Sequence, residues 1–210
     1  MNRQLHVDRF AERLNSSVPA NTAIIIAGWI VDLKVEFVIS RPRKSKLGDF
    51  RPPHQKKPAR ISVNSDLNPY NFLITTVHEF AHLGCYLKHG QTVAPHGAEW
   101  KKIYVDLLRP FLAKGIFPES LAKAVSTHIT RPVASSCSCP ALSKALVRFD
   151  KNPGRLLDEL QPGEVFTFRN KHFRVIEKRR TRFLCQHLTD GRKFLISGRA
   201  KVARETGLTA

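Results

Sequence analysis

The motif HEFAH, at residues 78–82, lies inside a long apolar stretch and constrains the fold and chemistry of this chain more than any other feature. Residues four apart share one face of a helix, so His78 and His82 can reach a single zinc ion. Glu79 can then approach a water molecule held by that ion. His96, fourteen residues after His82, is the best candidate for a third ligand, because three protein ligands leave the fourth tetrahedral position open. The pattern predicts one catalytic Zn²⁺.

The residues around the motif favour a helix. Asn68 can cap the free backbone amides, and Pro69 at the first helical position loses no hydrogen bond. Apolar residues then recur until Gly90, which suits a helix end. We predict a helix over residues 69–88. The alternative is a core helix whose histidines bind nothing, but burying two histidines and a glutamate would cost several kcal/mol unless a metal or hydrogen bonds offset it.

Four segments then follow one another in the order found in the SprT-like zinc metalloprotease domain. They are RKSKLGDF at residues 43–50, RISVN at 60–64, HEFAH at 78–82 and PHGAEW at 95–100. Over roughly residues 20–130 the chain closely resembles this family, whose relatives include the Spartan proteases that degrade proteins crosslinked to DNA. The resemblance implies zinc ligands at His78, His82 and His96 and a catalytic Glu79. It implies a substrate less firmly than a metal site.

The whole sequence predicts an α+β protein in three parts. We expect a small zincin-like metalloprotease core over residues 1–130, with its HExxH helix packed on a short antiparallel sheet. A helical linker over residues 131–160 leads to a small basic all-β module over residues 161–210, SH3-like or a partly open barrel. Further helices are expected at residues 3–15, 20–31, 99–112, 117–128, 141–148 and 154–160. Strands are expected at residues 34–39, 59–63, 165–168, 172–176, 182–185 and 193–196, and a loop or long hairpin connection at 41–58.

A formal net charge of +18 indicates a polyanionic partner; nucleic acid is the simplest candidate, and the resemblance favours DNA. Residues 41–60 hold eight basic residues against one acidic residue, and residues 151–210 hold fourteen against six. The alternative is a solvated surface that keeps the protein soluble; we favour nucleic-acid contact, which would weaken steeply with salt. Single- and double-stranded DNA both remain open. The expected contacts are Arg43, Lys44, Lys46, Lys56, Lys57, Lys178, Arg179, Arg180 and Arg182.

Basic residues interleaved with aromatic ones suit a nucleic-acid surface, because rings stack on bases and cations meet phosphates. The basic cluster at residues 178–182 has phenylalanines nearby. For Phe183 and Phe194 we nevertheless predict that the rings fill a small core.

Two further residues near the motif have open roles. Glu99 either hydrogen-bonds a ligand histidine or is a first-turn acid favoured by the helix dipole, and both alternatives stand. For Cys85, three residues after His82, we favour packing over ligation. A second, structural zinc site would need Cys137, Cys139, Cys185 and His187. Their C-x-C and C-x-H spacing is unusual for such sites, so we predict ordinary reduced cysteines.

These features predict a zinc-dependent endopeptidase in which Glu79 assists the attack of zinc-bound water on a peptide bond. The expected protein substrates are DNA-associated or DNA-crosslinked. The alternative is a basic DNA-binding or scaffold protein with a non-catalytic protease-like zinc core, but a structural site has no need of Glu79. A metal-dependent nuclease is less favoured, because phosphodiester chemistry usually recruits Mg²⁺ or Mn²⁺ held by carboxylates.

The sequence also predicts where the protein works. The most apolar run, residues 23–31, is far shorter than the about 20 residues of a membrane span. The N-terminal segment is charged and lacks the apolar region of a signal peptide. We therefore expect a cytoplasmic protein without membrane contact, associated with the nucleoid if it binds DNA.

Overall fold

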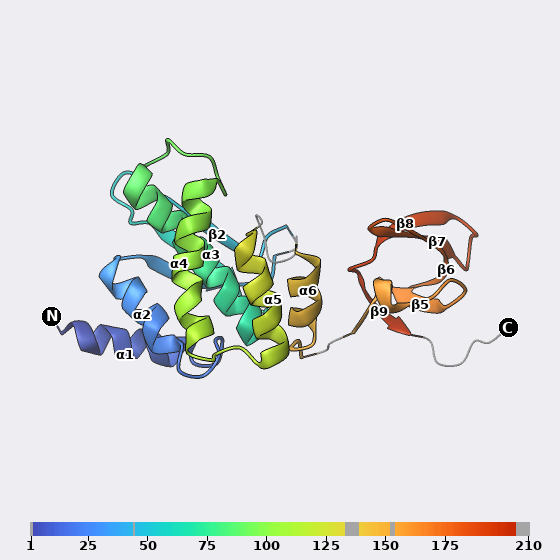
Figure 1. Cartoon of the computed structure of the whole chain (residues 1–210), viewed down its shortest axis with the longest axis horizontal. Coiled ribbons are helices and arrows are strands. Elements are labelled where there is room, and N and C mark those ends of the chain that lie inside the picture. Colours follow the sequence, from blue (N-terminus) through green and yellow to red (C-terminus); the bar gives the residue numbers. More distant parts are fainter. Residues whose placement is uncertain (1, 44, 133–138, 152–153, 205–210) are drawn as a thin grey trace. The chain divides into compact units, whose positions relative to one another are not determined.

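The computed structural model describes residues 2–43, 45–132, 139–151 and 154–204. It contains two compact units, Met1–Lys151 and Asn152–Ala210 (Figure 1). The first unit combines helices with a small mixed sheet and the second holds an antiparallel sheet, which confirms the predicted α+β class. The segment 131–160, predicted as a helical linker, is divided between the two units. Among the helices of the described ranges, none is long and apolar enough to cross a bilayer.

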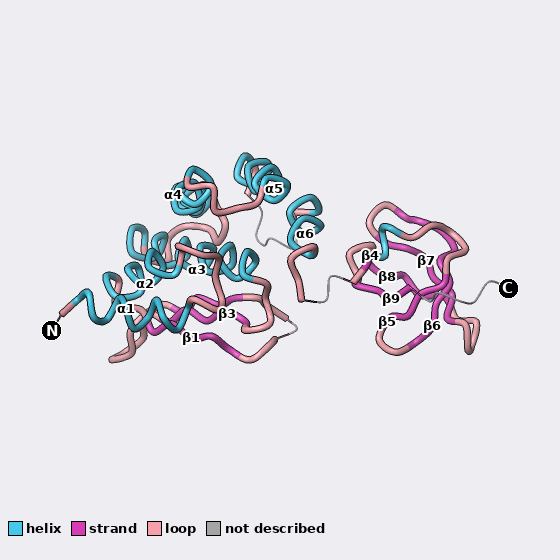
Figure 2. The backbone as a smooth tube through the Cα atoms, turned by 90° about the horizontal axis from the view of Figure 1, so that it is seen from below, coloured by secondary structure: helices cyan, strands magenta, loops and turns pink. Residues whose placement is uncertain are grey.

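The first unit is built in layers. Its elements are α1 (Arg3–Leu14), α2 (Ala23–Asp32), β1 (Glu36–Ser40), β2 (Gly48–Arg51), β3 (Arg60–Asn64), α3 (Pro69–His89), α4 (Ala98–Ala113), α5 (Glu119–Thr130) and α6 (Pro140–Val147). Figure 2 shows the sheet, α3 and α4 as successive layers. Because α3 lies between the sheet and α4, it buries side chains all round rather than along one stripe.

The sheet of the first unit is mixed, with the order β1-β3-β2. β1 runs parallel to β3, whereas β2 is antiparallel to it. The prediction of a short antiparallel sheet is therefore wrong for the β1–β3 pair, which is parallel. The reason is a crossover: after β1 the chain passes to the far side of β3 and forms β2 there, within the segment 41–58 that was expected to be a loop or long hairpin connection. β2 consequently becomes an edge strand.

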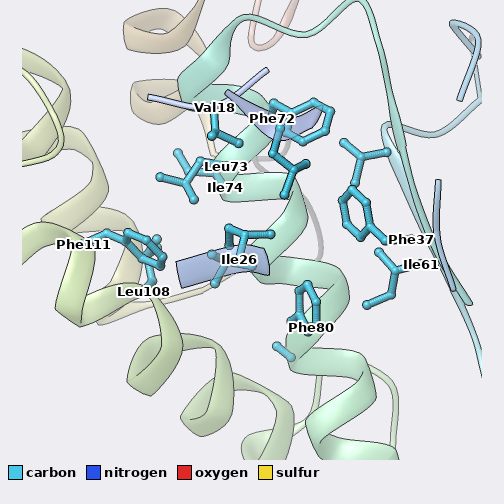
Figure 3. Packing of buried hydrophobic residues seen from close by; sticks show 14 of the residues in the cluster. Val18, Ile26, Phe37, Ile61, Phe72, Leu73, Ile74, Phe80, Leu108 and Phe111 are labelled. Atoms are coloured by element: carbon cyan, nitrogen blue, oxygen red, sulfur yellow. The ribbon is translucent and has the colours of Figure 1, made fainter. Parts of the chain in front are cut away.

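The core of this unit fixes the orientation of α3. Figure 3 shows Phe37 and Ile61, which come from the sheet, facing Phe72 and Phe80 of α3. The rings of Phe37 and Phe80 are 6.4 Å apart and nearly parallel, at 12°. On another side of α3, Phe111 of α4 is fully buried. Burial of each such side chain stabilises the fold by about 1.5–3 kcal/mol, so the position of the HEFAH motif on the helix is strongly determined.

The ends of α3 agree with the prediction of a helix over residues 69–88. The side chain of Asn68 accepts a hydrogen bond of 2.9 Å from the amide of Asn71, and Pro69 occupies the first turn. Gly90 follows the last helical residue with a φ of 61°. The Asn68 side-chain amide also donates to the carbonyl of Leu146 at 2.9 Å. One side chain therefore caps α3 and holds α6 against its start.

The second unit is a six-stranded antiparallel sheet with the order β4-β9-β5-β6-β7-β8. Its elements are β4 (Arg155–Leu156), the 3₁₀ turn η2 (Leu157–Glu159), β5 (Val165–Phe168), β6 (Lys171–Arg179), β7 (Arg182–His187), β8 (Lys193–Ser197) and β9 (Lys201–Arg204). The four strands β5 to β8 were predicted, whereas β4 and β9 were not. Phe166, Phe173 and Phe183 lie in its own small hydrophobic core.

Two expectations about this unit are wrong. The helix expected at residues 154–160 is instead β4 followed by η2, because the amides of Leu157 and Asp158 donate to the carbonyls of Ala200 and Gly198. The spacing of the leucines resembles a helix, but hydrogen bonding to the sheet decides their conformation. Phe183 is buried as predicted, but Phe194 is 42% exposed because it lies on the edge strand β8.

Candidate metal centre

Three imidazole rings converge in the first unit. The Nε2 atoms of His78 and His82 are 3.1 Å apart, those of His82 and His96 are 3.1 Å apart, and those of His96 and His78 are 3.2 Å apart. We call these residues the histidine cluster. Within the described residues it is the one group of three or more His, Cys, Asp or Glu side chains that could hold a metal ion. The structure therefore brings together the three residues predicted as zinc ligands.

The spacing of the nitrogens fits zinc. Ligand nitrogens on a tetrahedral ion with bonds of 2.0–2.1 Å lie about 3.3 Å from one another. The triangle of Nε2 atoms in the histidine cluster has sides of 3.1–3.2 Å, so all three can bind the same ion. Three neutral imidazoles are also a donor set that zinc accepts, and they leave a fourth position for a water molecule or a substrate.

Two elements position the ligands. His78 and His82 lie one turn apart on α3, and His96 lies in the segment between α3 and α4. His96 has a φ of 58°, a conformation that L-residues adopt rarely and that is often found at functional sites. The amide of Gly97 closes the turn by donating to the carbonyl of Ala94 at 3.0 Å. A Cβ atom at Gly97 would lie 2.9 Å from that same carbonyl oxygen, so the turn that presents His96 requires glycine.

Burial keeps the histidine cluster in its metal-binding form. The pKa of His78 is lowered to about 3 and that of His82 to about 4, chiefly by burial and also by the neighbouring imidazoles. Burial also lowers the pKa of His96. The rings are therefore neutral near pH 7, and a neutral imidazole offers the nitrogen lone pair that a metal needs.

Trp100 lies against all three ligands. Its ring centroid is 4.7 Å from His78, 5.4 Å from His82 and 4.7 Å from His96, and the side chain is 1% exposed. Tyr104 stacks on the indole at 4.9 Å, with an interplanar angle of 10°. Sequence reasoning had placed Trp100 in the core but missed its contact with the ligands. The available signal was its proximity in sequence, because Trp100 lies only four residues after His96.

Glu79 is buried next to β2. Its side chain is 6% exposed, and a Cβ atom at Gly48 would overlap its carboxylate. The pKa of Glu79 is raised to about 8, chiefly by burial and also by the charge of Asp49. The charges of Arg43 and Lys46 lower it, as does a backbone hydrogen bond from Phe50. Glu79, the predicted base, therefore lies in an environment that favours the protonated carboxyl group more strongly than bulk water does.

Arg43 and Lys46 have partners inside the protein. Arg43 donates to the Oδ1 atom of Asn64 at 2.8 Å and to the hydroxyl of Ser62 at 3.0 Å. The Asn64 amide donates to the carbonyl oxygens of Arg43 at 3.1 Å and Lys46 at 2.9 Å. Lys46 forms an ion pair of 2.7 Å with Asp49. These two residues hold the crossover between β1 and β2 near Glu79, a role that sequence reasoning, which assigned them to nucleic acid, did not find.

The other predicted nucleic-acid contacts are spread over both units. Lys44 lies outside the described residues. Lys56 and Lys57 are exposed in the turn between β2 and β3. Arg180 and Arg182 are exposed at the turn between β6 and β7. In the same turn region, the Lys178 ammonium lies 5.7 Å from the Phe183 ring, and Arg179 pairs with Glu177.

The remaining candidate ligands that the structure describes do not join the histidine cluster. Glu99 is exposed in the first turn of α4, and among the described contacts no hydrogen bond links it to a ligand histidine. Cys85 is buried, and burial raises the pKa of its thiol. Cys137 lies outside the described residues. Cys185 is buried and donates to the carbonyl of Phe183, and His187 shares a hydrogen bond of 2.7 Å with Asp190.

A cavity of about 240 Å³ opens beside the histidine cluster. Its lining includes His82, His96, Phe50, Tyr86 and Val93, so the metal ligands form one wall and apolar side chains form the others. The Phe50 ring stacks on His82 at 6.4 Å with an interplanar angle of 7°. The cavity therefore offers an apolar surface directly next to the candidate metal position.

Comparisons with models of protein families, with curated proteins and with solved structures found no match to this chain.

Proposed function

We propose that this chain is a zinc-dependent endopeptidase of the SprT-like, zincin-like type that acts on DNA-associated or DNA-crosslinked proteins. The observation that supports this proposal best is the convergence of three Nε2 atoms to within 3.1–3.2 Å of one another, with Glu79 next in sequence to His78. Three ligands leave room for a substrate, whereas structural zinc sites usually have four protein ligands.

The residues of the site have separate roles in peptide hydrolysis. His78, His82 and His96 hold the ion, and Trp100 holds their rings in place. A bound zinc ion supplies a Lewis acid that polarises the scissile carbonyl and lowers the pKa of water toward about 7. Glu79 accepts the proton of the attacking water and transfers it to the leaving amine.

The surroundings of Glu79 suit an extended substrate. β2 pairs with β3 on one side only, so the backbone groups along its other edge can bind a peptide as an added strand. The close approach of Gly48 to Glu79 brings this edge strand next to the base. The apolar cavity beside His82 and His96 then accommodates one apolar side chain of the substrate.

The charge of the chain supports the choice of substrate. A net charge of +18 favours association with a polyanion, and a protease that binds DNA meets proteins that are attached to it. Exposed basic residues occur in both units, at Lys56 and Lys57 in the first and at Arg180 and Arg182 in the second.

The proposal is tested by cleavage of a protein crosslinked to single-stranded DNA. Glu79→Gln removes the base and leaves the three histidines, so cleavage should fall by about a hundredfold or more while zinc content stays at one ion per chain. Glu12→Gln, the same substitution at an exposed position on α1, is the matched control and should cleave like the wild type. Equal cleavage by Glu79→Gln and the wild type would show that the peptidase proposal is wrong.

A further inference from the structure

The second unit contains a cavity of about 480 Å³ that the peptidase site does not use. It opens between the start of β6, the end of β5 and the edge strand β8. Its lining includes Phe168, Arg169, Lys171, Phe173 and Phe194. We call it the phenylalanine cavity. Its volume lies in the range of sites that bind small molecules or single groups of a larger ligand.

Aromatic rings form the wall of the phenylalanine cavity. Phe173 is 5% exposed and packs on Phe166 with its ring centroid at 5.7 Å. Phe194 meets Phe173 edge to face at 5.7 Å and 86°, yet is itself 42% exposed. The inner ring is therefore fixed by the core, and the outer ring presents uncovered surface. The exposed face of the Phe194 ring is thus available for stacking on a flat ligand.

The cavity has a basic rim. The guanidinium of Arg169 lies 5.2 Å from the Phe168 ring, and Lys171 is exposed at the start of β6. Within the described residues, neither cation has an ion pair with an acidic side chain. Among the described residues, no acidic side chain lines the cavity. A cationic rim repels ammonium and methylated-lysine ligands and attracts ligands that combine a flat ring with a negative charge.

We propose that the phenylalanine cavity binds an unstacked base of a single-stranded nucleic acid. The base stacks on Phe194, and Arg169 and Lys171 contact the adjoining phosphates. A base in a duplex is already stacked and paired, so it enters such a cavity only at the cost of leaving its neighbours. The site therefore selects single strands. This inference deepens the DNA-associated part of the proposed function by naming the form of nucleic acid that the second unit binds.

The test measures binding of fluorescent oligonucleotides to the full chain carrying Glu79→Gln, so that no peptidase activity is involved. The probes are oligo(dT) and oligo(rU) of about 15 nucleotides, which covers the site of a single binding module, and an abasic sugar-phosphate chain of the same length. The wild-type cavity should bind the base-containing probes more tightly than the abasic chain. The tighter of oligo(dT) and oligo(rU) identifies the preferred sugar, and either result supports the proposal.

Three substitutions separate stacking from charge. Phe194→Ala should weaken binding of the base-containing probes about 5- to 100-fold and leave the abasic chain unchanged, and Phe194→Trp should preserve binding. Arg169→Gln should weaken all probes to a similar degree. Leu188→Ala, which removes another exposed apolar side chain of the same unit, is the matched control and should change nothing.

Two results would overturn the inference. The first is equal affinity of the wild type for the abasic and base-containing probes. The second is wild-type affinity in a Phe194→Ala protein whose thermal unfolding shows that it is folded. Because peptide cleavage is not measured here, either failure leaves the peptidase proposal intact, and a failed cleavage assay leaves this one intact.

Discussion

A Cβ atom at Gly48 would overlap the carboxylate of Glu79 and lie 2.8 Å from its Cγ atom. β2 therefore passes directly against the proposed base, and only a residue without a side chain fits between the strand and α3. The same close approach makes the position of the edge strand depend on Glu79, and the position of Glu79 depend on the strand.

Gly48→Ala should therefore damage both the fold and the site. The added methyl group must push β2 or Glu79 aside, which should cost about 1–3 kcal/mol of unfolding free energy and most of the peptidase activity. Gly28→Ala is the matched control, because the nearest atom to its new Cβ is the flexible Arg3 guanidinium at 3.9 Å. In the interior of α2 it should be neutral or stabilise by about 0.5–1 kcal/mol. Urea unfolding and cleavage rates measure both effects. Wild-type activity in Gly48→Ala would contradict this geometry.

Trp100 should control zinc affinity as well as stability. Trp100→Leu removes the indole that contacts all three ligand rings, so zinc should bind more weakly in competition with a chelator. Loss of so large a buried side chain should also cost about 3–5 kcal/mol of unfolding free energy. Trp29→Leu removes an indole that packs on Phe80 and Phe111, away from the ligands. It should lower stability but leave zinc affinity unchanged, and equal zinc affinities of the two variants would refute the role of Trp100.

The sequence predicted the convergence of the three histidines because their geometry is local. His78 and His82 lie one turn apart on a helix with clear start and stop signals, and His96 follows closely in the chain. β2 could not be predicted, because GDFR has no alternating pattern and its conformation depends on pairing with β3 and on contact with Glu79. The role of Arg43 was missed for a related reason, since its partners Ser62 and Asn64 lie about twenty residues away and only the fold brings them together.

In the second unit, alternation of apolar and polar residues identified β5 to β8, but long-range hydrogen bonds decided the rest. Leu157 and Leu160 are spaced as on a helix, yet both are buried against a sheet that residues 201–204 complete. The exposure of Phe194 likewise follows from the strand order, which places β8 at an edge. The alternation of apolar and polar residues along a strand does not determine the strand order.

The metal-free protein should be more stable at high pH when Glu79 is replaced by Gln. Burial raises the pKa of Glu79 from 4.5 to about 8, so the folded state binds a proton that the unfolded state has released. The stability due to this group is complete below pH 4.5 and is lost as the pH rises through about 8. Glu79→Gln should therefore raise the free energy of unfolding relative to the wild type. This difference should grow between pH 4.5 and about 8 to the order of a few kcal/mol and then level off. Urea unfolding of chelator-treated protein across this range measures it, and a pH-independent difference would contradict the expected burial.

The buried histidines should have the opposite effect at lower pH, where the free energy of unfolding of the metal-free protein should rise with pH. The pKa values of His78 and His82 are lowered from 6.5 to about 3 and about 4, so below pH 6.5 the unfolded chain binds protons that the folded metal-free protein does not. Stability from these groups is present above pH 6.5 and is lost as the pH falls toward 3. His78→Asn should flatten this part of the profile, and His54→Asn, the same substitution at an exposed position, is the matched control. Identical slopes in wild type and His78→Asn would show that His78 titrates freely.

Asn64 should matter more for the site than its distance from the zinc ligands suggests. Its side chain is 1% exposed and holds the crossover by accepting from Arg43 and donating to the carbonyls of Arg43 and Lys46. Asn64→Asp keeps the acceptor and removes the two donated bonds, whereas Asn64→Ala also removes the two bonds accepted from Arg43 and Ser40. Since each lost bond leaves a buried polar group unpaired at about 1–3 kcal/mol, both variants should be less stable than the wild type. Both should lose activity while keeping zinc, because β2 shifts and the histidine cluster does not. Loss of zinc together with activity would instead show that the crossover supports the ligands themselves.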